Sequence, residues 1–162
     1  FILFLGTIEP RKNVETLIDA FQIIKKQPGF DYSLVIAGKL GGKLGWKINK
    51  IRQKVKNIPD IVLTDFIPDE DKPFFYNLAS LFVYPSYHEG FGFPPLEAMA
   101  CGCPAITSAN SSLTEICADA VMSIEPHNIN DLVSAIQKML QPETAKYYRD
   151  KGLERAKTFS WD

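Results

Sequence analysis

The sequence predicts an α/β fold: a doubly wound, Rossmann-like parallel sheet of about six strands with helices on both faces. Short apolar runs bounded by Gly, Pro, Asp or Ser alternate with longer stretches whose apolar residues recur at helical spacing. The short runs are too uniformly apolar for strands with one face in water, so we expect helices on both faces. With 162 residues and no linker, repeat or low-complexity tract, the chain predicts one domain, 1–162.

The expected elements follow one another along the chain. The first helix has the clearest pattern, because its apolar residues share one helical face: Val14, Leu17, Ile18, Phe21 and Ile24. Strands are predicted at residues 1–5, 33–37, 61–64, 81–84, 105–107 and 121–124. Further helices are predicted at residues 48–58, 69–79, 94–100, 130–140 and 144–157. Strands that alternate with helices in this way predict parallel pairing.

Composition and charge exclude several classes of protein. Hydrophobic residues make up 46% of the sequence and charged residues 23%, as in ordinary globular domains. The net charge of −1 gives no basic footprint, so we expect no nucleic-acid partner. No apolar run reaches the roughly 18 residues that span a bilayer. The sequence starts within the first predicted strand and without methionine, so we expect a piece of a longer protein.

Cysteine and histidine content gives little support for disulfides or metal ions. The odd number of cysteines, Cys101, Cys103 and Cys117, suits a reducing compartment. The C-x-C spacing of the first two favours small buried residues beside a turn over a metal or redox site. With only His88 and His127, a multi-histidine metal site is hard to build. We therefore expect no metal ion and no cofactor.

Loops at the carboxyl ends of the strands are the candidate site, because doubly wound sheets bind ligands there. The loop from Gly6 to Asn13 carries Arg11 and Lys12 directly before a predicted helix. Two cations beside the free N–H groups of a helix start favour an anion site. A solvated pair of surface charges is an equal alternative. Asn13 is expected to cap the helix.

The next two strand-end loops carry weaker signals. Residues 37–43 form a glycine-rich loop with two lysines, and Lys39 sits directly at the strand end. This loop suits a close approach to phosphate, with a solvated turn as the alternative. After the third strand, Phe66 and Ile67 can present an apolar surface and backbone groups to a nucleobase edge. Asp69 is predicted to be an N-cap.

The loop after the fourth strand is the most informative, reading E-G-F-G-F-P-P-L-E from Glu89 to Glu97. Its glycines let the backbone approach a ligand, and its prolines suit the opening of a helix, which together favour a bound diphosphate. Glu97 is expected in the first helical turn. There it either interacts with the helix dipole or accepts hydrogen bonds from a vicinal diol, and the paired glutamates favour the diol. Neither G-x-G-x-x-G nor a P-loop is present, which disfavours hydride transfer and P-loop hydrolysis.

These residues resemble the group 1, or family 4, retaining glycosyltransferases, and the resemblance is to the carboxy-terminal domain of their two-domain GT-B fold. The signature P-S-x-x-E-G-F-G-x-P-x-L-E-A-M-A-C-G-x-P runs from Pro85 to Pro104, and the resemblance covers essentially the whole chain. The opening G-T-I-E-P-R-K-N from Gly6 is similar to a variant associated with mannosyl and related transferases of bacterial surface polysaccharides. The commoner form has arginine directly after the glycine, where this sequence has Thr7.

The resemblance implies a role for each candidate residue. The implied catalytic residues hold the donor diphosphate, stabilise the leaving nucleotide and lie by the transferred sugar: Arg11, Lys12 and Glu89. The implied donor-binding residues line the strand ends, meet the nucleobase, offer backbone N–H groups or bind the ribose: Gly6, Lys39, Ile67, Gly90, Phe91, Gly92 and Glu97. The segment F-S-W, residues 159–161, resembles the point where the family's chain returns to the amino-terminal domain.

The implied reaction moves a hexose, with mannose from GDP-mannose as the first choice, from a nucleoside-diphosphate sugar to a glycan or lipid-linked acceptor. Anomeric configuration is retained, and no metal is required. The resemblance places the acceptor, and any peripheral contact with the inner face of a membrane, on an amino-terminal domain absent from this chain. We expect a cytoplasmic protein whose isolated domain is inactive. A nucleotide-binding module and a sugar-nucleotide epimerase domain are the alternatives.

Overall fold

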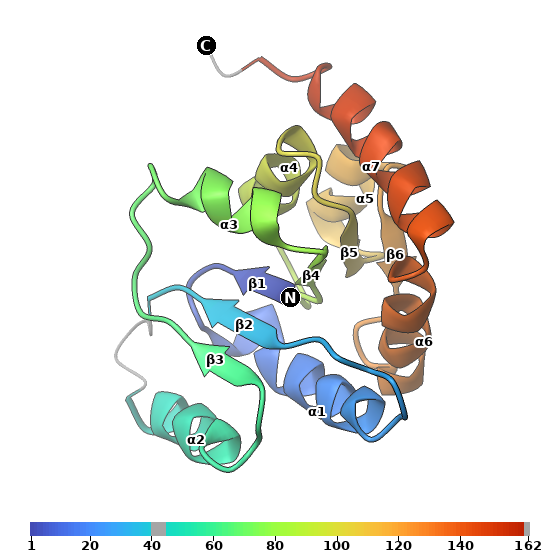
Figure 1. Ribbon diagram of the computed structural model, residues 1–162. Helices are drawn as coiled ribbons and strands as arrows, with labels where there is room; N and C mark the ends of the chain where they lie inside the picture. The colour runs from blue at the N-terminus through green and yellow to red at the C-terminus, as the bar shows by residue number, and fades with distance from the viewer. Residues whose placement is uncertain (40–44, 161–162) are drawn as a thin grey trace.

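A single six-stranded parallel sheet forms the centre of the computed structural model, which describes residues 1–39 and 45–160. The strands lie in the order β3-β2-β1-β4-β5-β6 (Figure 1). Their bounds are β1 Ile2–Leu5, β2 Leu34–Ala37, β3 Ile61–Leu63, β4 Leu81–Tyr84, β5 Ala105–Ser108 and β6 Met122–Ile124. Every strand pair is parallel, which confirms the predicted doubly wound α/β fold.

The order in which strands are added to the sheet changes direction between β1 and β4, although all strands stay parallel. The chain runs outward from β1 through β2 to β3, then returns to pair β4 on the other side of β1 before continuing to β6. Ile2 aligns with Leu34 on one side and Leu81 on the other, and Leu3 is likewise paired on both sides. Such a switch point leaves a crevice at the carboxyl ends of the two central strands, where ligands of these sheets bind.

Helices cover both faces of the sheet. The helices α1 (Val14–Lys25), α2 (Gly45–Val55) and α6 (Ile129–Met139) lie on one side (Figure 1). The helices α3 (Lys72–Leu78), α4 (Phe93–Ala100) and α5 (Ser111–Cys117) lie on the other, and α7 (Pro142–Ala156) packs against α4 and α6. Among the described residues, no helix has the length and apolar character needed to cross a membrane.

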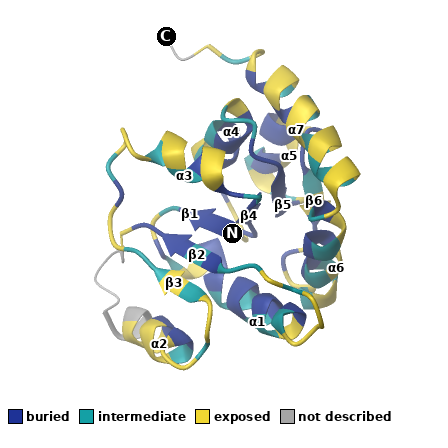
Figure 2. Cartoon of the chain, in the orientation of Figure 1, coloured by how far each residue is buried: buried dark blue, intermediate teal, exposed yellow. Residues whose placement is uncertain are grey.

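Burial separates the central strands from those at the edges (Figure 2). All four residues of β1 and all four of β4 are buried, as their uniformly apolar sequence predicts. The same expectation is wrong for the edges, because Val62 of β3 is 49% exposed and Ser123 of β6 is also exposed. An edge strand lacks a neighbour on one side and lies at the margin of the helical layers, so part of its surface stays in water.

One expectation about local structure is wrong, and two short helices were not predicted. Asp69 is not an N-cap, because α3 begins only at Lys72, and the Asp69 carboxylate instead pairs with the Lys72 ammonium at 2.6 Å. The helix α5 was not predicted, since seven residues give too short a periodic signal. A short 3-10 helix, Pro10–Lys12, was also missed. Most of the glycine-rich loop, at 40–44, and Trp161 lie outside the described residues.

The cysteines behave as small buried residues beside a turn. Cys103 and Cys117 are buried, Cys101 is half-buried, and no disulfide joins them. Gly102 supplies the turn between the first two with a φ of +67°. Burial raises the pKa of Cys103 to about 12 and that of Cys117 to about 11, which keeps both thiols protonated and unreactive at neutral pH.

Candidate functional site

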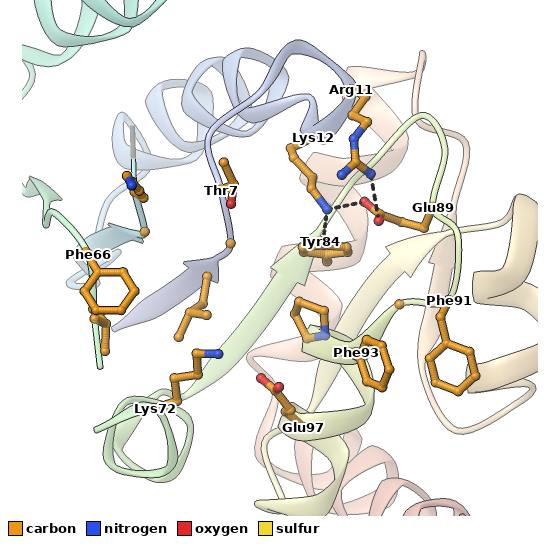
Figure 3. Close-up of a pocket in the computed structure, with 17 residues that line it drawn as sticks. Thr7, Arg11, Lys12, Phe66, Lys72, Tyr84, Glu89, Phe91, Phe93 and Glu97 are labelled. Atoms are coloured by element: carbon orange, nitrogen blue, oxygen red, sulfur yellow. Dashed lines mark hydrogen bonds and ion pairs between the residues drawn. The ribbon is translucent and has the colours of Figure 1, made fainter. Parts of the chain in front are cut away.

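A cleft of about 450 Å³ opens at the switch point, lined by the loops that follow β1, β2, β3 and β4 (Figure 3). The structure brings nine of the ten sequence-predicted site residues to its walls: Gly6, Arg11, Lys12, Lys39, Ile67, Glu89, Phe91, Gly92 and Glu97. Gly90 is not among the residues that line it. No group of three or more His, Cys, Asp or Glu side chains arranged for a metal ion occurs within 1–39 and 45–160.

The floor of the cleft is made by close backbone contact between Gly6 and Gly38. Gly38 has a φ of +140°, and a Cβ atom there would lie 2.1 Å from the Gly6 carbonyl oxygen. The amide of Gly6 donates to the carbonyl of Ala37 at 2.9 Å, and that of Ile8 donates to Lys39 at 3.1 Å. The β1 and β2 loops therefore run together, and only glycine fits at position 38.

Asn13 anchors the loop that carries Arg11 and Lys12. It occupies the N-cap position of α1, as predicted, but in a left-handed conformation with φ 56° and without a capping hydrogen bond. Its amide instead donates to the carbonyls of Pro85 at 3.1 Å and Pro126 at 2.9 Å. The predicted N-cap position is thus confirmed, while the side chain makes other contacts. The side chain ties the β1 loop to the loops after β4 and β6.

The cations and Glu89 form one cluster on a wall of the cleft (Figure 3). The Lys12 ammonium donates to Glu89 Oε1 at 2.6 Å and to the Tyr84 hydroxyl, and it lies 4.8 Å from the Tyr84 ring centroid. Arg11 Nη1 donates to Glu89 Oε2 at 2.9 Å, while its Nε donates to Glu9 at 2.8 Å. Lys12 and Glu89 are each only 6% exposed, so the alternative of a solvated surface pair is wrong for Lys12.

Burial and pairing act in opposite directions on the ionisation of this cluster. Burial lowers the pKa of Lys12, and the hydrogen bond and charge of Glu89 offset only part of that effect. Burial raises the pKa of Glu89, but the hydrogen bond from Lys12 and the charges of Lys12 and Arg11 outweigh it, leaving the pKa below its ordinary value. The Glu89 carboxylate is therefore held ionised between the two cations.

The cluster keeps donors available for a further anion. Among the described residues, Lys12 donates to two partners, and an ammonium has three donors. The Arg11 guanidinium is half-exposed, and its contacts in the described chain come from Nε and Nη1, which leaves Nη2 for a ligand. Cations with spare donors in a partly desolvated cleft suit a phosphate or diphosphate.

Glu97 lies across the cleft from the cations (Figure 3). It is the fifth residue of α4, so the predicted place in the first helical turn is wrong, and so is the helix-dipole alternative. The Tyr76 hydroxyl donates to its Oε2 at 2.9 Å. A second cavity of about 370 Å³ shares Glu97 and Lys72 with the first. The half-buried carboxylate retains acceptor capacity for hydroxyl groups of a ligand.

Aromatic and apolar side chains complete the cleft. Phe66 is 66% exposed, whereas its neighbour Ile67 is 7% exposed, so Phe66 offers the larger apolar surface beside the β3 loop. Phe91 and Phe93 pack with ring centroids 4.7 Å apart where the β4 loop enters α4. These rings give the cleft flat apolar walls between its charged ends, suited to a planar base or a sugar face.

Sequence reasoning missed three side chains of the site: Tyr84, Tyr76 and Lys72. Tyr84 had a weak signal, since it ends β4 directly before the informative loop. Tyr76 contacts Glu97 from another helix, 21 residues away, which no local pattern shows. Lys72 lines the cleft from α3, and its pKa is raised mainly by a hydrogen bond with Asp69 and to a smaller extent by the charge of Glu97.

The fold and the site together define an α/β domain whose cleft at the switch point has side chains suited to an anionic, hydroxyl-bearing ligand. Residues 1–155 match the family described as glycosyl transferases group 1. The chain belongs to this family, and its structure is the Rossmann-like domain of a GT-B glycosyltransferase.

Similarity to individual proteins agrees with this assignment. The chain is 37% identical over 166 residues to O-antigen chain mannosyltransferase B of Escherichia coli, covering 100% of this chain and 42% of that protein. It superposes on sucrose-phosphate synthase of Thermosynechococcus elongatus with a TM-score of 0.84 at 29% identity, over 99% of this chain and 41% of the other. The chain thus spans less than half the length of these relatives.

One similar structure is itself a separate domain. The C-terminal domain of a glycosyl transferase group 1 family protein, LpcC, from Francisella tularensis matches 98% of this chain and 85% of that chain, with a TM-score of 0.79. At 23% identity this match shows a shared fold.

Proposed function

We propose that this chain is the donor-binding domain of a retaining hexosyltransferase that uses a nucleoside-diphosphate sugar. One observation carries the proposal: a single cleft at the switch point holds Arg11 and Lys12 on one wall and Glu97 on the other. A nucleoside diphosphate has the matching chemistry, since a diphosphate and a ribose diol are separated by a short covalent path. Membership of the glycosyl transferases group 1 supports this ligand class.

In this proposal, Arg11 and Lys12 bind the diphosphate and assist its departure. When the bond from the sugar carbon to the diphosphate oxygen breaks, negative charge grows on the leaving group and the sugar gains oxocarbenium character. Preorganised cations and N–H groups aimed at that charge lower the barrier, and no metal ion is required. Glu89, which holds both cations, lies beside the transferred sugar.

At the other end of the cleft, Glu97 accepts hydrogen bonds from the ribose hydroxyls. Phe66 and Ile67 of the β3 loop meet the base, and the backbone at Phe91 and Gly92 faces the phosphates. The acceptor, a glycan or lipid-linked sugar, and any membrane contact belong to the part of the protein outside this chain. The isolated domain therefore binds donor without transferring it.

The test uses the intact protein that carries this domain, with radiolabelled nucleotide sugar, in the presence and absence of acceptor. Transfer that requires acceptor and retains anomeric configuration supports the proposal. Interconversion of the sugar without acceptor identifies an epimerase, and binding without either reaction identifies a nucleotide-binding module.

Mannose is the first sugar to test, because the relative from Escherichia coli is named a mannosyltransferase. A panel of nucleoside diphosphates and nucleotide sugars in a thermal-shift assay would identify the donor. We expect GDP-mannose to give the largest rise in melting temperature, since a ligand that binds only the folded state stabilises it. A larger rise with another nucleotide sugar would reject mannose while keeping the cleft as the donor site.

A further inference from the structure

A set of packed, buried aromatic rings, called the stack below, lies beneath the cleft and includes two tyrosines. Phe82 and Tyr84 point to the same face of β4, because side chains two apart on a strand do so. The ring centroid of Phe82 lies 5.7 Å from that of Tyr84 and 5.4 Å from that of Tyr76. Phe4 of β1 stacks on Tyr84 at 5.7 Å. All four rings are buried, so the two tyrosines are fixed relative to one another.

The hydroxyls of these tyrosines contact side chains that lie on opposite walls of the cleft. The Tyr76 hydroxyl donates to Glu97 Oε2 at 2.9 Å, and the Tyr84 hydroxyl accepts from the Lys12 ammonium. Burial raises the pKa of Tyr76 well above its ordinary value, helped by the charge of Glu97 and the hydrogen bond to it. Tyr76 is therefore a permanent neutral donor to the Glu97 carboxylate.

Glu97 needs such a partner if it is to present its carboxylate in one direction. It is half-buried and lines both the main cleft and the second cavity, so its side chain has room on either side. Tyr76 lines only the second cavity of the two. Its bond to Oε2 restricts the glutamate rotamers, while Oε1 accepts no hydrogen bond from residues 1–39 and 45–160 and so leaves acceptor capacity for a ligand.

We propose that Tyr76 is a positioning residue, which orients the Glu97 carboxylate toward the vicinal hydroxyls of a bound ribonucleotide and so sets the preference for ribose over 2′-deoxyribose. The inference rests on the proposed function, since it takes Glu97 to be the ribose ligand. Tyr76 touches no ligand itself, and it acts through Glu97.

The test measures the affinities of the intact protein for GDP and 2′-deoxy-GDP, with UDP and 2′-deoxy-UDP in parallel, by calorimetric titration. A hydrogen bond to an ionised carboxylate predicts a ribose preference of roughly ten- to hundredfold for the unmodified protein. Tyr76→Phe keeps the ring in the stack. We expect it to lower the ribose preference at least threefold by weakening the ribonucleotides alone.

Tyr84→Phe is the matched control, since it removes the hydroxyl of the other tyrosine in the same stack. It should weaken ribo- and deoxyribonucleotides equally, because it acts on the Lys12 ammonium. A Tyr76→Phe variant that keeps the full ribose preference, or that weakens both sugars equally, would overturn the inference. Thermal unfolding of both variants shows whether each keeps its fold.

Glu97→Ala separates this inference from the proposed function. A ribose preference that disappears in Glu97→Ala but persists in Tyr76→Phe overturns only the positioning role. A preference that is absent from the unmodified protein, or that survives Glu97→Ala, overturns the ribose assignment of Glu97 and the inference with it.

Discussion

Replacing Lys12 with methionine removes the ammonium while keeping an unbranched stem of similar length in the buried site. Two of the three ammonium donors already bind Glu89 and Tyr84 within the described structure, which leaves one for the diphosphate. A hydrogen bond to a charged group contributes about 1.5–3 kcal/mol. We therefore expect nucleoside-diphosphate affinity to fall roughly 10- to 150-fold, measured by calorimetric titration of the intact protein with GDP and UDP.

Two further variants separate lost binding from lost folding. Lys50→Met removes an exposed lysine that pairs with Glu15 at 2.9 Å outside the cleft, so it should leave affinity unchanged. Lys12→Met leaves Glu89 with Arg11 as its remaining cation, at a cost in stability below the ~3–5 kcal/mol of a fully broken buried pair. Adding Glu89→Gln to Lys12→Met should recover stability but not affinity. A folded Lys12→Met variant with unchanged affinity would refute the reasoning.

Three other predictions test the cleft. Gly38→Ala should destabilise the protein by more than about 2 kcal/mol, because its Cβ would overlap the Gly6 carbonyl. Gly90→Ala places its Cβ in open space and should change stability by less than about 0.5 kcal/mol. Urea unfolding measures both changes. Because burial lowers the pKa of Lys12, nucleoside-diphosphate affinity should decline with rising pH before an exposed lysine titrates, and titrations of Lys12→Arg should lack that decline. Folding lowers the pKa of Glu89, so the ionised carboxylate stabilises the folded protein at pH values above its ordinary pKa. This stabilisation is lost as the pH falls through the lowered pKa of the folded state. The difference in stability between the unmodified protein and Glu89→Gln should therefore vanish in acid.

The fold was predictable because its signal is local. All residues of the central strands β1 and β4 are buried, and consecutive apolar residues in the sequence predict this burial on both faces. The edges were less predictable, because no residue of β3 is buried and β6 combines half-buried, exposed and buried residues, although both runs are mostly apolar. The short helix α5 carries too few turns for its period to emerge.

The site was predictable as a set of loops but not as a set of contacts. Arg11, Lys12, Glu89 and Glu97 follow strand ends, and the parallel topology alone gathers strand ends at one edge. That Lys12 is buried depends on Glu89, 77 residues away, which local sequence does not encode. The sequence therefore indicated which residues line the cleft but not which of them contact one another.

The contacts of Glu89 and Glu97 decide between two chemistries for a pair of glutamates. A retaining hydrolase places two carboxyl groups about 5–5.5 Å apart, one as acid and one as nucleophile. Here the Glu89 carboxylate lies between Arg11 and Lys12, where a lowered pKa makes it a poor general acid. Glu97 is bound by Tyr76 on the opposite wall. Carboxylates with such separate partners do not form a hydrolytic pair. Under the proposed function, Glu89 holds the cations of a diphosphate site and Glu97 accepts hydrogen bonds from the ribose, and neither role requires the two carboxylates to act as an acid and nucleophile pair.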